Sequence, residues 1–285
     1  MNDRSSQLQG RPWLNVPYYF VGCARRVPTM LSKHEQLLYY WLGAHWARGA
    51  GDFVDLGSYV GGSTACLAEG HITATLPGRI HAFDMFTSSE KLKQRMLYSG
   101  GIDPFEGEDI LPLSQKLLSP WSDRVVFHKG EITDQTWDGT PIEVLTMDAS
   151  KIALKTDAMA RIFFPSLIPG GSVLVQQDYL HFSQPWIAAQ MELLADYVQP
   201  VGHCPDDSMV YLCTRQIDQD ALDHAEVGLL TDAELLDLVE AAKARHAGKG
   251  LEARFDQMSR AIAANPDVRI AWKFAKPQDD PLPPA

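Results

Sequence analysis

A glycine-rich turn between a hydrophobic run and a helix is the first feature of this sequence that could bind a ligand. Residues 52–56 predict a short buried strand, and residues 63–69 predict a helix. Gly57 follows the strand directly, and Gly61 and Gly62 open the helix. Glycine permits a positive φ and close approach of the backbone, and the first N–H groups of a helix are free to bind polar groups. The spacing G-x-x-x-G-G, without a following Lys-Ser/Thr pair, argues against NAD and ATP.

An aspartate ends the next expected strand, residues 79–83. In a doubly wound sheet, Asp84 would lie beside the turn that follows Asp55, where a carboxylate can accept hydrogen bonds from both ribose hydroxyls. The alternative is a helix cap or a solvated loop acid. Together with the glycine turn, Asp84 indicates a nucleoside-type ligand.

A second pair of ionisable residues follows the expected strand at 142–147. Asp148 and Lys151 are three positions apart at its carboxyl end, where open α/β sheets bind their ligands. An aspartate and a lysine at this spacing could hold a metal ion and deprotonate a hydroxyl. Alternatively, Asp148 is an acid favourably placed at a helix N-terminus and Lys151 faces solvent.

The expected strand at 172–177 is followed by polar and aromatic residues. His181 could act as a general base, because an unperturbed pKa of about 6.5 suits neutral pH. A structural hydrogen bond is the alternative for this histidine. Tyr179 and Trp186 are expected to line the pocket rather than to take part in the chemistry.

The elements that must position these residues alternate between strand and helix. Strands are expected at 52–56, 79–83, 124–129, 142–147 and 172–177, and helices at 32–48, 63–69 and 157–167. This alternation predicts a doubly wound, mainly parallel α/β sheet covered on both faces. Two further runs, 198–202 and 209–213, are joined by a turn-forming cluster and predict an antiparallel terminal hairpin.

Additions are expected on both sides of a central domain at residues 51–215. Residues 1–50, rich in proline and aromatic residues, are expected to form a lid or a subunit contact, in a chain expected to be a homo-oligomer. Residues 87–121 are long for a crossover and are expected to complete the lid. Residues 216–285 predict C-terminal helices and a disordered proline-rich tail.

Composition and charge limit the class of ligand. The chain has 285 residues, of which 45% are hydrophobic, enough for a full α/β core. Its 25 basic and 36 acidic residues give a formal net charge of -11. This charge argues against nucleic acid or an anionic membrane as a partner unless a local basic patch exists, and no run of like charges suggests one. A small molecule is the expected partner.

The cysteines and the N-terminus bear on the cellular compartment. None of the four cysteines has metal-ligand or redox spacing. Cys66 and Cys213 are expected to be buried free thiols, with a Cys204–Cys213 disulfide as the alternative. The N-terminus lacks the apolar region of a signal peptide, and no stretch of about 18 apolar residues is present. A soluble cytoplasmic protein is therefore expected.

Several motifs, in order, resemble those of class I S-adenosylmethionine-dependent methyltransferases. Residues 54–64 are similar to the first motif, and Ala-Phe-Asp-Met-Phe at 82–86 resembles the acidic second motif of the macrocin O-methyltransferase-like branch. Residues 169–175 resemble the entrance to the fifth strand, and the hairpin resembles the reversed seventh strand. The resemblance covers about residues 50–215 and implies a seven-stranded, Rossmann-like fold that binds S-adenosylmethionine. The residues implied to bind it are Asp55, Gly57, Ser58, Tyr59, Gly61, Gly62, Ser63, Asp84, Met85, Glu131 and Asp148.

The D-x-x-K spacing of Asp148 and Lys151 is also similar to that of catechol and caffeoyl-CoA O-methyltransferases. In those families the aspartate binds Mg²⁺ and the lysine is the general base, and an Asp-Asn or Asp-Asp pair follows the fifth strand. Here that pair is Gln177 and Asp178. A glutamine carbonyl can bind Mg²⁺ but brings no charge. The resemblance implies a magnesium site at Asp148, Gln177 and Asp178, and a metal-free site with His181 as the base is the alternative.

The resemblance implies methyl transfer to a hydroxyl oxygen of a sugar or phenolic metabolite. The protein would chiefly align the nucleophile, the methyl group and the leaving sulfur. Two alternatives stay open, a metal-independent N- or C-methyltransferase and a subunit that binds the cofactor without catalysing transfer.

Overall fold

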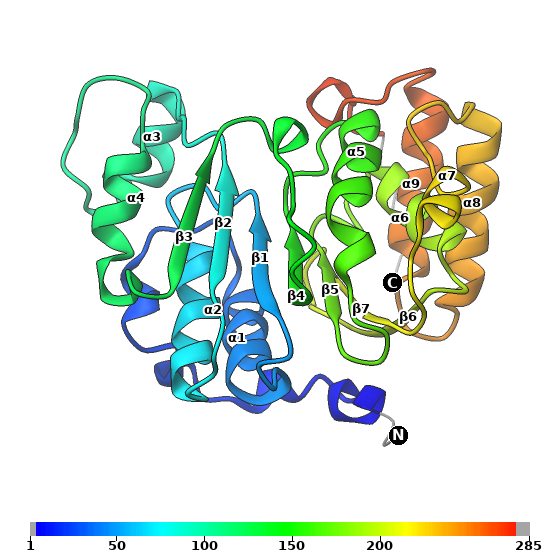
Figure 1. The fold of residues 1–285 in the computed structure, drawn as a ribbon. Helices are drawn as coiled ribbons and strands as arrows, with labels where there is room; N and C mark the ends of the chain where they lie inside the picture. Colours follow the sequence, from blue (N-terminus) through cyan, green and yellow to red (C-terminus); the bar gives the residue numbers. More distant parts are fainter. Residues whose placement is uncertain (1–3, 278–285) are drawn as a thin grey trace, which may run out of the picture.

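The computed structural model describes residues 4–277 and contains one mixed sheet of seven strands (Figure 1). The strands are β1 (Asp52–Leu56), β2 (Ile80–Asp84), β3 (Val125–Lys129), β4 (Ile142–Met147), β5 (Val173–Gln176), β6 (Val198–His203) and β7 (Met209–Cys213). Their order is β3-β2-β1-β4-β5-β7-β6, and β7 is antiparallel to both of its neighbours. The predicted doubly wound sheet with an antiparallel terminal hairpin is confirmed.

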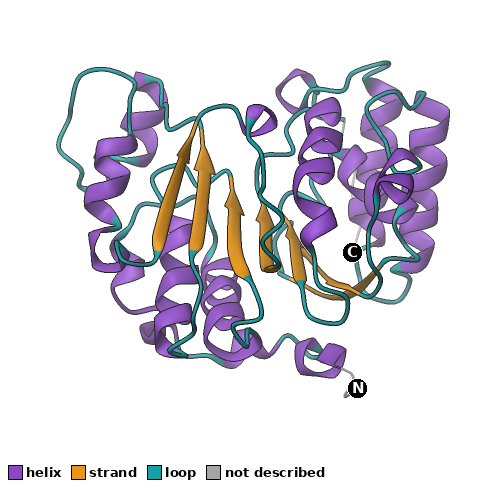
Figure 2. Cartoon of the chain, viewed as in Figure 1, coloured by secondary structure: helices purple, strands orange, loops and turns teal. Residues whose placement is uncertain are grey.

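Helices cover both faces of this sheet (Figure 2). They are α1 (Lys33–Trp41), α2 (Gly62–Thr73), α3 (Glu90–Met96), α4 (Leu111–Leu117), α5 (Ala153–Phe163), α6 (Pro185–Leu193), α7 (Gln219–Asp223), α8 (Asp232–Arg245) and α9 (Glu252–Ala264). Helix α5 begins four residues before the predicted position 157. The N–H of Ala153 donates to the carbonyl of Arg269 at 3.1 Å, so the far end of the chain supplies a partner for a free amide at the start of this helix.

The side chains of the central strands alternate between two hydrophobic clusters. Val54 and Leu145 point into a cluster with α5, α6 and the C-terminal helices α8 and α9. Their neighbours Phe53 and Val144 point into the other cluster, with α1, α2 and the N-terminal segment. Both faces of the sheet are therefore buried, as expected of parallel strands that read as continuous apolar runs.

The N-terminal segment packs on the α1/α2 side of the sheet. It forms short 3₁₀ turns, beginning with η1 (Arg4–Leu8), and it buries Trp13 and Val21 completely. The 87–121 segment forms α3 and α4, which lie beside the β3 edge of the sheet (Figure 1). Aromatic residues of the N-terminal segment thus contribute to the hydrophobic core.

A C-terminal strap, residues 268–274, returns from α9 to the carboxyl end of the sheet. Ile270 forms an antiparallel bridge with Ile152, and the N–H of Ala271 donates to the carbonyl of Lys151 at 2.9 Å. The loop between β4 and α5 is therefore paired with a segment that the sequence pattern did not place near it.

The cysteines are free thiols, and Cys66, Cys204 and Cys213 are buried. The disulfide alternative for Cys204 and Cys213 is thereby excluded. Within residues 4–277, no helix combines the length and the apolar composition needed to cross a bilayer. Positions 278–285 of the predicted disordered tail lie outside the described residues.

Candidate functional site

A cavity of about 670 Å³ opens where β1, β2, β4 and β5 end. The strand order reverses between β1 and β4, and such switch points form the ligand crevices of open α/β sheets. The volume is in the range of small-molecule sites. The predicted site residues that line it are Gly57, Tyr59, Asp84, Met85, Glu131, Asp148, Lys151, Gln177 and Asp178.

The first residues of the glycine turn form one wall of the cavity. Gly57 has a φ of 94°, and a Cβ atom at this position would lie 2.8 Å from the carbonyl oxygen of Asp148. Only glycine lets β1 and β4 approach this closely. The adjacent Ser58 hydroxyl is buried and has no hydrogen-bond partner among the described residues. It is therefore available to a polar group of a ligand.

Asp55 and Ser63 stabilise the glycine-rich turn and do not line the main cavity. The Asp55 carboxylate accepts hydrogen bonds from the hydroxyls of Ser63 (2.7 Å), Thr64 (2.6 Å) and Thr146 (2.8 Å). Burial raises the pKa of Asp55, and these three donors oppose the rise. The carboxylate thus ties the start of α2 and strand β4 to β1.

The glycine pair at the start of α2 allows neighbouring segments of the protein to pack closely against this turn. Gly61 is the N-cap of α2. A Cβ atom at Gly62 would lie 2.4 Å from the Cβ of Thr29, so the N-terminal segment occupies the space that a side chain would need. Gly62, Ser58 and Ser63 line a small hollow of about 20 Å³ that shares Gly57, Tyr59 and Asp148 with the main cavity.

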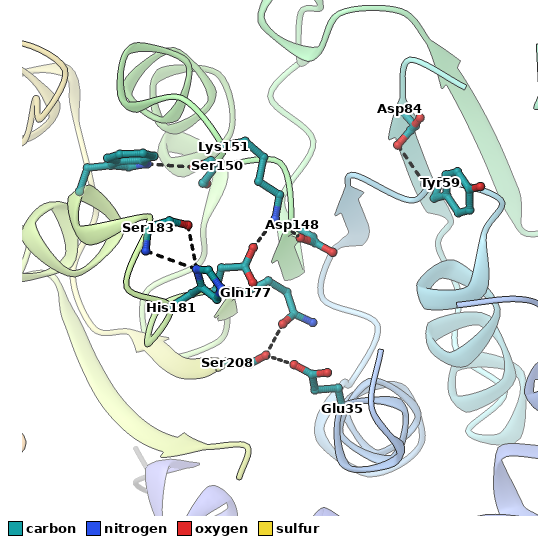
Figure 3. A network of polar contacts seen from close by, with 12 residues as sticks. Glu35, Tyr59, Asp84, Asp148, Ser150, Lys151, Gln177, His181, Ser183 and Ser208 are labelled. Atoms are coloured by element: carbon teal, nitrogen blue, oxygen red, sulfur yellow. Dashed lines mark hydrogen bonds and ion pairs between the residues drawn. The ribbon is translucent and has the colours of Figure 1, made fainter. Parts of the chain in front are cut away.

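Asp84 is held at the end of β2 by two backbone amides. Its carboxylate accepts from the N–H of Tyr59 at 2.9 Å and from the N–H of Phe86 at 2.6 Å. Burial raises the pKa of Asp84, although these two hydrogen bonds favour the charged form. Met85, next in the chain, is 48% exposed and gives the cavity an apolar surface beside this acid. Figure 3 shows Asp84 beside Tyr59, apart from the group around Lys151.

Lys151 joins Asp148 and Asp178 at the other end of the cavity, and Figure 3 shows its side chain beside Asp148. Its Nζ is 2.8 Å from Oδ1 of Asp148 and also contacts Oδ2 of Asp178. Burial alone would lower the pKa of Lys151, but the two carboxylates outweigh burial and raise it. Burial raises the pKa of Asp148 to about 6, whereas Lys151 holds that of Asp178 below its usual range despite burial. Lys151 is therefore a cation at neutral pH and cannot serve as the predicted general base.

The same geometry does not fit the expected magnesium site. The Lys151 ammonium occupies the place between Asp148 and Asp178 that a divalent cation would need. Gln177 is buried, and its amide nitrogen donates to the hydroxyl of Tyr39 at 3.1 Å while its amide oxygen accepts from Ser208. In the described part of the chain, no three acidic, histidine or cysteine side chains gather as metal ligands. The donor set is that of a lysine bridge between two acids.

The residues that follow β5 depart from the sequence-based expectation. His181 does not line the cavity, and its Nδ1 forms a hydrogen bond with the Ser183 hydroxyl at 2.8 Å. Tyr179 and Trp186 do not line it either, so the prediction that they form the pocket wall is wrong. Both belong to the hydrophobic core on the α5/α6 side, where the Trp186 indole N–H donates to the carbonyl of Ser150 at 2.8 Å.

Several lining residues were not predicted from the sequence. Trp272, on the C-terminal strap, is 68% exposed, and it lines the cavity together with the half-exposed Met30. Glu35 and the hairpin-turn acids Asp206 and Asp207 also line it. Of the two parts of the expected lid, residues 87–121 contribute Thr87 alone to the lining, whereas residues 1–50 contribute Met30, Leu31, Ser32 and Glu35. Lone residues in distant segments carry no local pattern that could have identified them.

The cavity is rich in negative charge. Its acidic lining residues are Glu35, Asp84, Glu131, Asp148, Asp178, Asp206 and Asp207, and its lysines are Lys151 and Lys155. Both lysines are already paired, Lys151 with its two aspartates and Lys155 with Glu131. Carboxylates are therefore in excess, and the field in the cavity favours ligands that carry positive charge.

A scan against protein-family models finds no match, and no curated protein matches the sequence. Solved structures similar to the chain include a TDP-rhamnose 3'-O-methyltransferase of calicheamicin biosynthesis, at 14% identity over 74% of this chain and 92% of that chain, with a TM-score of 0.45. A SAM-dependent O-methyltransferase from Thermotoga maritima is 13% identical over 68% of this chain and 70% of its own, with a TM-score of 0.42. An SAH-bound methyltransferase from Podospora anserina is 12% identical over 87% of both chains, with a TM-score of 0.39.

Proposed function

We propose that this protein transfers the methyl group of S-adenosylmethionine to a hydroxyl oxygen of a small molecule, without a metal ion. The observation that carries the proposal is that a single cavity joins Asp84, at the end of β2, to the Asp148–Lys151–Asp178 bridge at the ends of β4 and β5. One end suits a nucleoside, and the other holds charged groups that can act on a hydroxyl.

The nucleoside end would use groups that the fold leaves available. The Asp84 carboxylate can accept hydrogen bonds from ribose hydroxyls, since each of its oxygens has lone-pair capacity beyond the one amide that it binds. Met85 offers an apolar surface to the base, and the unpartnered Ser58 hydroxyl can bind a polar group. The excess of carboxylates favours a cationic cofactor. When bound, S-adenosylmethionine supplies a methyl group on a positively charged sulfonium, which leaves as a neutral thioether.

At the acceptor end, Lys151 would act as a cation and Asp148 as a base. The Lys151 ammonium can donate a hydrogen bond to the acceptor oxygen and stabilise the negative charge that develops there. Asp148 is suited to take the hydroxyl proton, because its pKa of about 6 is close to neutral pH. Asp178, whose pKa Lys151 holds low, would keep the ammonium in position. The acceptor would be a sugar or phenolic hydroxyl compound.

Two measurements test this proposal. Isothermal titration calorimetry with S-adenosylhomocysteine should show saturable binding, and absence of binding by both it and S-adenosylmethionine would overturn the whole proposal. Transfer of a labelled methyl group to a panel of hydroxyl acceptors should proceed equally with and without EDTA. Activity that is lost in EDTA and restored by Mg²⁺ would instead support the metal-assisted mechanism.

A further inference from the structure

A second pocket of about 360 Å³ lies at the opposite end of the strand order from β3, along the edge strand β6. One side is formed by η1 and the turn that follows it, and the other by the loop between α8 and α9. No residue lines both this pocket and the main cavity. It is a separate hollow, and the proposed methyl transfer makes no use of it.

The ionisable residues of this edge pocket are all basic. Arg11, His203 and Lys249 line it, and no acidic residue does. Among residues 4–277, neither Arg11 nor Lys249 forms an ion pair with a carboxylate. Arg245, four positions before Lys249, is by contrast paired with Glu192 through two contacts of 2.8 Å. The edge pocket therefore carries uncompensated positive charge in a chain whose net charge is -11.

Arg11 and Lys249 both act on His203 in this pocket. Burial lowers the pKa of His203, and the positive charges of Arg11 and Lys249 lower it further. Arg11 is partly buried, which limits the screening of its charge by water, and the partly buried His203 is neutral until an anion favours its protonation. An anion bound between these side chains would offset the effect of Arg11 and Lys249 on a protonated His203 and would accept charge-assisted hydrogen bonds.

The backbone around the edge pocket is also unusual. Arg11 has a φ of 56°, in the left-handed region that non-glycine residues seldom adopt. In β6 the pairing with β7 skips Val201, because the register shifts between Pro200 and Gly202. A bulge in an edge strand leaves backbone groups outside the ladder, and Val201 lines the pocket. Backbone groups can therefore add to the side-chain donors.

We propose that the edge pocket binds the phosphate group of a small phosphorylated molecule, held by Arg11, His203 and Lys249. Arginine offers a planar pair of donors that matches a phosphate, and lysine adds a point charge at the rim. The volume exceeds what one phosphate group needs, so the remainder of the ligand would lie along β6 and the polar side chains of Gln9 and Gln199.

The test uses inorganic phosphate, and glycerol phosphate compared with glycerol, on the full-length chain by isothermal titration calorimetry. Both anions should bind saturably at millimolar concentration or below, and glycerol should not bind. Arg11→Gln and Lys249→Gln should each weaken phosphate binding about tenfold, because each removes one charge-assisted hydrogen bond. The matched control Lys116→Gln, at an exposed position of α4 outside the pocket, should leave binding unchanged.

An NMR titration of the His203 ring gives a second readout. Phosphate should raise the His203 pKa in the wild-type protein, because a bound anion favours the imidazolium. The rise should shrink in both variants and persist in Lys116→Gln. Equal phosphate affinity in all four proteins, or an unchanged His203 titration at saturating phosphate, would overturn the proposal. Circular dichroism establishes that each variant is folded.

Discussion

The main cavity and the edge pocket lie on the same sheet, but the ionisable residues that line them differ in the sign of their charge. Seven acids line the main cavity, and both of its lysines are paired with them. The ionisable residues that line the edge pocket are all basic, and Arg11 and Lys249 are without carboxylate partners in the described structure. The contrast teaches that the net charge of a chain does not set the sign of its individual sites. What matters is which ionisable side chains line each site and whether an opposite charge neutralises them.

The largest effect on this contrast should come from removing the lysine of the main cavity. Lys151→Met leaves Asp148 and Asp178 without their cation, and we expect kcat to fall by about 10²–10³, the usual cost of losing one donor to a developing oxyanion. Binding of S-adenosylhomocysteine should change little. Calorimetry with Mg²⁺ sharpens the test, since the freed carboxylates should bind the ion in the variant and not in the wild type. Wild-type kcat in the variant would contradict the proposed role.

A substitution at the proposed nucleoside end should change the affinity for S-adenosylhomocysteine. Asp84→Asn removes the charge that accepts ribose hydroxyls, and we expect the Kd for S-adenosylhomocysteine to rise about tenfold to a hundredfold, as for lost hydrogen bonds to a charged group. The exposed loop variant Asp103→Asn is the matched control and should bind normally. If both variants bind alike, Asp84 does not hold the ribose.

The pH dependence of transfer should report on Asp148. Burial raises the pKa of this carboxyl to about 6, so it becomes protonated as the pH falls through that value and can no longer accept a proton. We expect kcat/KM to fall about tenfold per pH unit below this point. Lys151 should add no decline near neutral pH, since its pKa is raised. A profile that Asp148→Asn leaves unchanged in shape would assign the acidic limb to another group.

The smallest effect should come from the rim of the main cavity. Trp272→Ala removes an exposed indole, and we expect KM for the acceptor or the cofactor to rise about fivefold with kcat nearly unchanged, as for loss of an aromatic contact. Leu229→Ala, 82% exposed and outside both hollows, is the control. Equal KM values for the two variants would remove Trp272 from the binding surface.

The fold and the position of Asp84 beside the glycine-rich turn were predictable because their signals are local in the chain. The strand–turn–helix around Gly57 and the strand-end position of Asp84 are each set within a few residues. One half of the lysine bridge, the pair of Asp148 and Lys151, was predictable because these residues are close in the sequence. The protonation state of Lys151 was not predictable, because it depends on Asp178. The contact between these two residues comes from tertiary packing.

The corrections have the same physical origin. Gln177 looked like a metal ligand, but its amide is bound by Tyr39 and Ser208, which lie on α1 and beside β7. The edge pocket could not be predicted from the sequence, because Arg11, His203 and Lys249 come from three distant segments. A search for runs of like charge cannot detect a cluster of this kind.

The C-terminal strap has a consequence for how the protein is made. Lys151 and Ile152 pair with Ala271 and Ile270, so the rim of the main cavity depends on one of the last described segments of the chain. Synthesis proceeds from the N-terminus, and contacts between distant residues form late. On the ribosome, the sheet and the α1/α2 layer can therefore assemble while the loop at Lys151 still lacks its partner. The rim of the main cavity would then be complete only after residues 268–274 have left the ribosome.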